Sequence, residues 1–173
     1  SANSLDAGYL FHSKDRRENA AMKTMGCGRR GDALKFWLYW VRYGKQGFGH
    51  HVDAGLQLAT ELVEYIRSKP ELELGPLADP LFLQICFRPK QPDSADDAAH
   101  ALDQEQVRVR SKGTQFVYQE LKRRRMFAVD FAPLPNDIGD YIRLVVHPRT
   151  RMDDLRTLVD QVAEIGCAYW KQA

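Results

Sequence analysis

A nearly unbroken apolar stretch, residues 33–41, is the feature that most restricts how this chain folds. It reads Ala-Leu-Lys-Phe-Trp-Leu-Tyr-Trp-Val, which places large apolar side chains on almost every side of a helix. Left in water, such a helix would expose a large hydrophobic surface. Gly44 favours the end of this helix shortly after Val41. We therefore expect residues 33–41 to form a short helix that is buried on most sides.

After this helix, the spacing of apolar residues alternates between helical and strand periodicity. The expected elements are, in order, the helix over 33–41, a longer helix from Gly47 to Pro70, a strand over 81–88, a helix over about 114–125, strands near 128–132 and 141–146, and a last helix after Pro148. Thr150 and Asp153 have the spacing of a capping box for that last helix. Residues 12–31 and 90–105 read as polar loops.

Composition excludes several classes of function. The chain has 173 residues, 44% of them hydrophobic and 28% charged, and a net charge of +2, which predicts neither a nucleic-acid nor a membrane partner. The one dense basic run, residues 122–125, is interpreted as the solvated end of a helix. Three cysteines without a CxxC pair predict no metal site and no disulfide framework. No signal peptide is visible, so we expect a cytoplasmic protein.

Arg143 is the first candidate functional residue. It lies in the apolar strand 141–146 and, by the period of two, shares a face with Tyr141 and Val145. An arginine on the solvated face of an antiparallel sheet explains this pattern. A guanidinium placed to bind a carboxylate with a bidentate fork is the more specific interpretation, and the spacing favours it less than the solvated face. The spacing alone leaves both interpretations open.

The glycine-rich stretch 26–31, Gly-Cys-Gly-Arg-Arg-Gly, is the second candidate. A glycine-rich turn before a helix exposes backbone N–H groups that bind anions. The stretch matches neither the dinucleotide-binding nor the P-loop spacing. A flexible hinge is therefore an equally good interpretation.

Taken together, four stretches resemble the group II pyridoxal-phosphate decarboxylases, especially the branch that acts on glutamate and cysteine sulfinate. Residues 7–11, Ala-Gly-Tyr-Leu-Phe, resemble the segment before the family's mobile active-site loop. Residues 27–38 are similar to its Cys-Gly-Arg-x-x-Asp-x-x-Lys-x-Trp-Leu stretch, which is the most specific match. Residues 85–89 resemble the strand that reads Val-Cys-Phe, and residues 141–146 resemble the late strand that carries the family's arginine.

This resemblance implies an α/β protein of the fold type I, PLP-dependent transferase class. Residues 1–46 would be the tail of the large domain, with a mobile loop at 12–25 and a buried helix. Residues 47–173 would be the small C-terminal α+β domain, with helices packed on a short antiparallel sheet. The family works as a homodimer with the active site at the interface and uses pyridoxal 5'-phosphate. Arg143 would bind the substrate carboxylate, and Gly28 and Arg29 would contact the cofactor.

Two departures from the family pattern qualify the expected activity. The family's Schiff-base lysine directly follows a histidine, and this chain contains no His-Lys pair. We therefore expect the chain to be inactive without a lysine-bearing N-terminal part of the same enzyme. The family's loop tyrosine is also missing between His12 and Arg30, and His12 is a candidate substitute acid.

The expected function is decarboxylation of an acidic amino acid by the full protein, a lyase of amino-acid metabolism. The missing loop tyrosine keeps open an altered outcome, either deamination linked to decarboxylation or carbon–carbon bond formation. The missing lysine keeps open an alternative from another class, a stand-alone, non-catalytic α+β module for binding or dimerisation.

Overall fold

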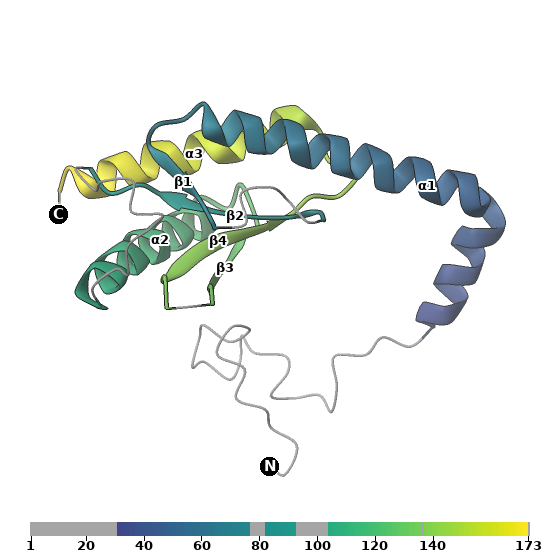
Figure 1. Ribbon diagram of the computed structural model, residues 1–173, viewed down its shortest axis with the longest axis horizontal. Helices are drawn as coiled ribbons and strands as arrows, with labels where there is room; N and C mark the ends of the chain where they lie inside the picture. Colours follow the sequence, from purple (N-terminus) through teal and green to yellow (C-terminus); the bar gives the residue numbers. More distant parts are fainter. Residues whose placement is uncertain (1–30, 77–81, 93–103, 136, 173) are drawn as a thin grey trace, which may run out of the picture. The chain divides into compact units, whose positions relative to one another are not determined.

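The computed structural model describes residues 31–76, 82–92, 104–135 and 137–172. Figure 1 shows the elements, which are α1 (Asp32–Arg67), β1 (Leu72–Leu74), β2 (Gln84–Pro89), α2 (Gln104–Arg124), β3 (Asp130–Pro133), β4 (Asp140–Val145) and α3 (Met152–Trp170). The chain divides into two compact units, residues 1–50 and 51–173. Each unit is described by itself, and the domain boundary expected at residue 46 stays a prediction.

In the first unit, the described residues are 31–50, the N-terminal part of α1. Gly44 has φ 60° and ψ −172°, which interrupts the helical geometry and confirms the helix break expected there. The described residues do not supply the expected burial of residues 33–41, which stays a prediction for the full protein. Six large apolar side chains are between 44% and 63% exposed, namely Leu34, Phe36, Trp37, Leu38, Trp40 and Val41. A helix that is apolar on almost every side is buried only when other segments pack around it, and residues 31–50 by themselves do not provide such segments.

In the second unit, four strands form one antiparallel sheet in the order β1-β2-β4-β3. β2 and β4 are the central strands, and Cys86 of β2 pairs with Arg143 of β4. β3 pairs with the other side of β4, so that Asp130 stands opposite Arg143. The register therefore fixes which side chains are neighbours on each face of the sheet.

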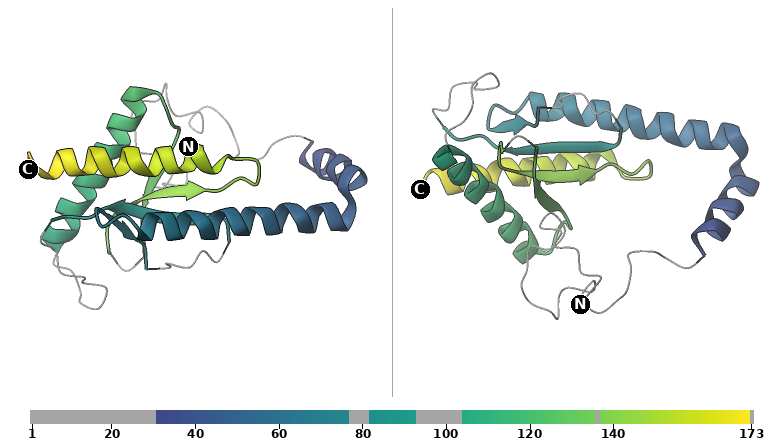
Figure 2. Two further views of the ribbon diagram at one scale, coloured as in Figure 1. Left: turned by 90° about the horizontal axis from the view of Figure 1, so that it is seen from above. Right: turned by 60° about the horizontal axis from the view of Figure 1, so that its bottom comes forward.

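One face of the sheet and the three helices enclose the hydrophobic core. The core residues are, from α1, Ala59, Leu62, Val63 and Ile66; from the strands and their ends, Leu72, Ile85, Phe87, Ile142 and Val146; from α2, Val117 and Leu121; and from α3, Leu155, Leu158, Val159, Val162 and Ile165. Figures 1 and 2 show α3 beside the C-terminal half of α1, where Tyr65 Oη donates a hydrogen bond of 2.9 Å to Asp160 Oδ1. Each fully buried leucine or isoleucine contributes about 1.5–3 kcal/mol.

An ion pair joins β1 and β2 at one end of the opposite face, between a fully buried arginine and a glutamate whose side chain is 29% exposed. Arg88 is 0% exposed and donates through Nε and Nη2 to both carboxylate oxygens of Glu73, at 3.2 and 2.9 Å. Its remaining nitrogen, Nη1, donates to the carbonyl oxygen of Ile138 at 2.8 Å. The Tyr141 hydroxyl also donates to Glu73, at 3.0 Å, and Arg110 Nη1 of α2 lies 3.9 Å from it. One carboxylate thus links β1, β2, β4 and α2.

Several elements differ from the expected ones. β1 was not expected, although Leu72 and Leu74 alternate with glutamates. α2 begins at Gln104, ten residues before the expected start, and Arg110 and Gly113 are buried in this additional part. The capping box of Thr150 and Asp153 is wrong. Arg151 is the N-cap of α3 and makes no side-chain capping bond, and Asp153 lies in the first turn, where its charge favours the helix dipole.

The structure also shows where the basic residues of the chain lie, among the residues it describes. The basic run 122–125 is at the C-terminal end of α2, with three of its residues in the last turn, as expected. Arg88, at the end of the strand expected over 81–88, is fully buried, and Glu73 compensates its charge. No helix among the described residues is long and apolar enough to cross a membrane.

Glu73→Gln is expected to destabilise the protein, because it leaves the buried Arg88 without a compensating charge. The free energy of unfolding should fall by about 3 kcal/mol, measured by urea denaturation of the full protein. Glu71→Gln is the matched control, since Glu71 is exposed two residues earlier and should change stability by less than about 0.5 kcal/mol. Equal stability of the two variants would show that the buried pair contributes nothing net.

Candidate functional site

The face of the sheet opposite the core carries a row of polar side chains at its centre. Arg143 stands between Cys86 of β2 and Asp130 of β3 in the antiparallel register. Residues directly opposite each other in such a sheet have Cβ atoms about 5 Å apart, so the three side chains form a continuous row. On the same strand, Val145 is 64% exposed. Among the described residues, this part of the face is therefore open. We call these three residues the polar row.

Arg143 is partly buried and only partly bonded. Its Nη2 donates to Asp130 Oδ2 at 3.3 Å, and the two side chains are 28% and 39% exposed. A guanidinium has five N–H donors, and among the described residues this is the one hydrogen bond that Arg143 makes. Arg88 on the same face uses all three of its nitrogens. Arg143 thus retains N–H donors that the described residues do not occupy.

Cys86 supplies a neutral side chain next to the arginine. Burial raises the pKa of the Cys86 thiol, and the Gln84 hydrogen bond and the charge of Arg143 lower it less than burial raises it. The thiol is therefore protonated at neutral pH, which argues against a nucleophilic role. Being small and uncharged, it leaves the charge of Arg143 uncompensated on that side.

The other residues expected at the site cannot be compared with this geometry. His12, Gly28 and Arg29 lie outside the described residues, as does the loop 12–25. Within the described ranges, no group of three His, Cys, Asp or Glu side chains is arranged to hold a metal ion.

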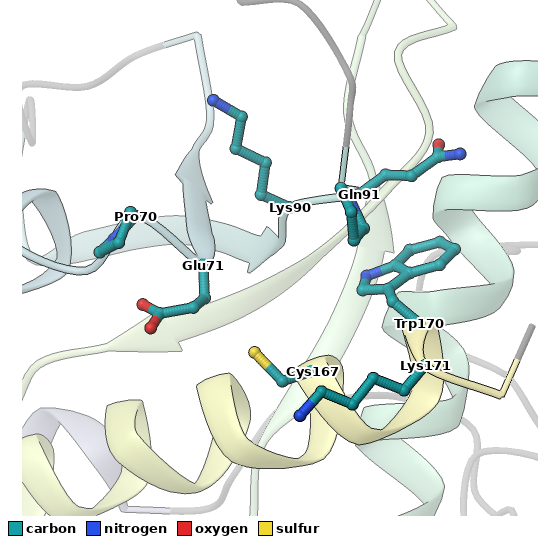
Figure 3. Close-up of a pocket in the computed structure, with 8 residues that line it drawn as sticks. Pro70, Glu71, Lys90, Gln91, Cys167, Trp170 and Lys171 are labelled. Carbon is teal, nitrogen blue, oxygen red and sulfur yellow. The ribbon is translucent and has the colours of Figure 1, made fainter.

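A separate pocket lies between the start of β1, the end of β2 and the end of α3 (Figure 3). It is about 440 Å³ in volume and is lined by Pro70, Glu71, Lys90, Gln91, Pro92, Cys167, Trp170 and Lys171. None of these residues belongs to the polar row. Lys90 and Lys171 lie on opposite sides of the pocket in Figure 3, so their charges do not converge on one point inside it.

Solved structures share the fold of this chain. Mouse CSAD is 24% identical to this chain, with a TM-score of 0.64, over 94% of this chain and 32% of that chain. Oryza sativa TDC with PLP and tryptamine is 16% identical, with a TM-score of 0.63, over 84% of this chain and 28% of that chain. The fold is that of one part of a PLP-dependent decarboxylase.

The sequence comparisons identify the family. The model of the pyridoxal-dependent decarboxylase conserved domain matches residues 1–90, and the chain belongs to this family. The L-aspartate decarboxylase dtxS4 of Metarhizium robertsii is 34% identical over 95% of this chain and 31% of that protein. The cysteine sulfinic acid decarboxylase of Rattus norvegicus is 32% identical over 70% of this chain and 27% of that protein. The chain thus spans about a third of the length of the curated relatives it matches. The resemblance and the fold class expected from the sequence are confirmed.

The described residues do not by themselves make a site for the family's cofactor. Pyridoxal phosphate is held by a lysine amine, with further groups for its ring nitrogen and phosphate. The polar row contains no amine, and the two lysines of the pocket do not converge. What the polar row fits is a carboxylate, because guanidinium donors match carboxylate geometry.

Sequence reasoning found Arg143 and missed its partner. Asp130 was within the expected strand 128–132, but nothing in one sequence shows which residue of another strand lies opposite Arg143. The one sequence signal was an aspartate, Asp130, next to the apolar residues of the expected strand. It identifies the partner of Arg143 only when the register of β3 and β4 is known.

Alkylation of Cys86 provides a test of the polar row. Because the positive charge of Arg143 lowers the pKa of the thiol, Arg143→Met should raise that pKa further and slow the reaction with iodoacetamide at pH 8. The rate is measured for the Cys86 peptide by mass spectrometry of the full protein. Arg108→Met, which removes an exposed charge from α2, should leave the rate unchanged. An unchanged rate in Arg143→Met would mean that the two side chains do not interact.

Proposed function

We propose that the full protein containing this chain is a pyridoxal-phosphate-dependent decarboxylase of an acidic amino acid or cysteine sulfinate. In this proposal, residues 1–173 supply the group that binds a carboxylate of the substrate, and a lysine-bearing part of the same enzyme holds the cofactor. The protein acts in the cytoplasm as a homodimer, with the active site at the interface.

The observation that carries the proposal is that Arg143 is partly buried and only partly hydrogen-bonded. Its guanidinium is partly buried, makes one hydrogen bond to Asp130, and stands on an open sheet face beside a neutral thiol. A carboxylate reaching this face would meet donors that are already partly desolvated, where a charge-assisted hydrogen bond is stronger than in water. Arg143 thereby binds and orients the substrate.

The names of the relatives support an acidic substrate. They include an L-aspartate decarboxylase, a cysteine sulfinic acid decarboxylase and, from Bos taurus, an acidic amino acid decarboxylase, GADL1. All three names refer to amino acids with a second acidic group. An arginine on an open face is a suitable partner for such a group, because it presents a planar fork to a planar carboxylate.

A second candidate concerns the outcome of the reaction at the same site. The sequence has no tyrosine between His12 and Arg30, which favours a reaction that does not end in simple decarboxylation. Product analysis by mass spectrometry separates the two, because simple decarboxylation yields an amine and deamination linked to it does not.

Arg143→Met is expected to weaken binding of acidic substrates while leaving the strand intact, since methionine fills irregular apolar space. The Michaelis constant of the full protein for aspartate, glutamate or cysteine sulfinate should rise by about thirtyfold. That rise corresponds to about 2 kcal/mol, the lower end of the range for a lost charge pair, because Arg143 is not fully buried.

Arg151→Met is the control for this kinetic test, because the Arg151 side chain is 76% exposed. Its kinetic constants should equal those of the unaltered protein. A preference of the full protein for an aromatic amino acid, measured in the same assay, would refute the acidic-substrate proposal.

We also propose that the apolar surface of residues 34–41 packs against the lysine-bearing part of the enzyme. These side chains are mostly exposed among the described residues, and two of them already stack on each other, with ring centroids of Phe36 and Trp40 6.1 Å apart. An apolar surface of this extent is a usual sign of an interface.

Residues 1–173 expressed alone are therefore expected to self-associate in sedimentation velocity. Replacing Leu38 and Val41 with glutamate should reduce this association, because it places charges on the apolar surface. Lys45→Glu, an exposed change just after the break at Gly44, is the control and should not reduce it. A stable monomer formed by the unaltered chain would contradict the proposal.

A further inference from the structure

Asp130 is bonded at both carboxylate oxygens. Oδ1 accepts the backbone N–H of Phe131 at 2.9 Å, and Oδ2 accepts Nη2 of Arg143 at 3.3 Å. The first bond fixes the carboxylate relative to the backbone of β3. The second therefore transmits the position of that strand to the guanidinium.

This arrangement differs from the other arginine–carboxylate pairs of the described residues. Glu120 pairs with Arg123 and Arg124 within one helix, where the pairs follow from the helical repeat. Arg88 and Glu73 form a buried fork with no nitrogen of the arginine left over. Arg143 and Asp130 come from neighbouring strands and share one bond, so that Nη1 and Nε of the arginine retain their donors.

The hydrogen bond from Arg143 Nη2 to Asp130 lowers the entropy that is lost when a ligand binds to this arginine. A free arginine side chain loses up to about 2 kcal/mol of rotamer entropy when it is fixed in one position. If Asp130 already restrains the side chain, less of that entropy remains to be lost when a carboxylate binds. Because Nη2 carries two N–H groups, one bond to Asp130 still leaves one bidentate edge of the guanidinium, formed by Nη2 with either Nη1 or Nε.

We infer that Asp130 is a positioning residue that orients Arg143 toward the substrate carboxylate. The inference rests on the proposed function, in which Arg143 binds that carboxylate. Asp130 acts through the arginine and does not contact the substrate. Its removal therefore affects substrate binding only while Arg143 is present.

Asp130→Asn is the appropriate change. The asparagine side-chain oxygen still accepts the N–H of Phe131, so the start of β3 is preserved. The amide nitrogen then faces Arg143, and it cannot accept a hydrogen bond from the guanidinium. The Michaelis constant of the full protein for its acidic substrate should rise about fivefold, as expected for a partly exposed charge pair. The turnover number should stay within about twofold, because bound substrate still reaches the same arrangement.

The matched control is Asp137→Asn, which makes the same change of charge at an exposed position just before β4. Asp137 has φ 53°, a conformation that asparagine adopts readily. Its kinetic constants should match those of the unaltered protein. The double variant Asp130→Asn/Arg143→Met completes a double-mutant cycle.

The cycle separates failure of this inference from failure of the proposed function. The expected result is that Asp130→Asn raises the Michaelis constant when Arg143 is present and has no effect in the Arg143→Met background. If Arg143→Met raises it and Asp130→Asn does not, the positioning role is wrong and the proposed function stands. If Asp130→Asn has the same effect in both backgrounds, Asp130 acts through the fold and the inference is overturned. If Arg143→Met has no effect, the proposed function fails, and the inference fails with it.

Discussion

The ion pair between the buried Arg88 and Glu73 is the interaction on which the arrangement of the sheet depends. An arginine that is 0% exposed is tolerated only when its charge is compensated and its donors are bonded. Glu73 supplies both carboxylate oxygens, and a loop carbonyl accepts from the third nitrogen. Because Glu73 is in β1 and also accepts from Tyr141 of β4, the short edge strand is fixed to the central strands. The pair therefore constrains the register of β1, β2 and β4 together.

That register gives the two arginines of the open face different roles. Along β2 and β4, positions two residues apart share a face, so Arg88 and Cys86 lie on the same side as Tyr141 and Arg143. At one end of the face, Glu73 and the carbonyl oxygen of Ile138 together occupy all three nitrogens of Arg88. In the centre, Arg143 has one partner and retains donors. The same side-chain chemistry is thus structural at one position and available for ligand binding two residues along the neighbouring strand.

The two units of the chain differ in how far their apolar side chains are buried. Residues 51–173 contain a core in which side chains from three helices and the sheet are fully buried. The described part of the first unit instead exposes most of its apolar side chains. The chain also spans about a third of the length of its curated relatives. Both observations support the proposal that the apolar helix packs against another part of the full protein.

The sequence by itself determined the family, most of the elements, the helix break at Gly44 and the candidacy of Arg143. These depend on local patterns, namely periodicity, glycine conformation and motif spacing. Only the tertiary structure decided which charges are paired. Glu73 meets Arg88 across 15 residues and Asp130 meets Arg143 across 13, and both contacts follow from strand register, which a period-two pattern does not specify. The burial of Arg88 and the incomplete bonding of Arg143 follow from these long-range pairings, because an arginine is satisfied or left available only by the groups that the fold places beside it.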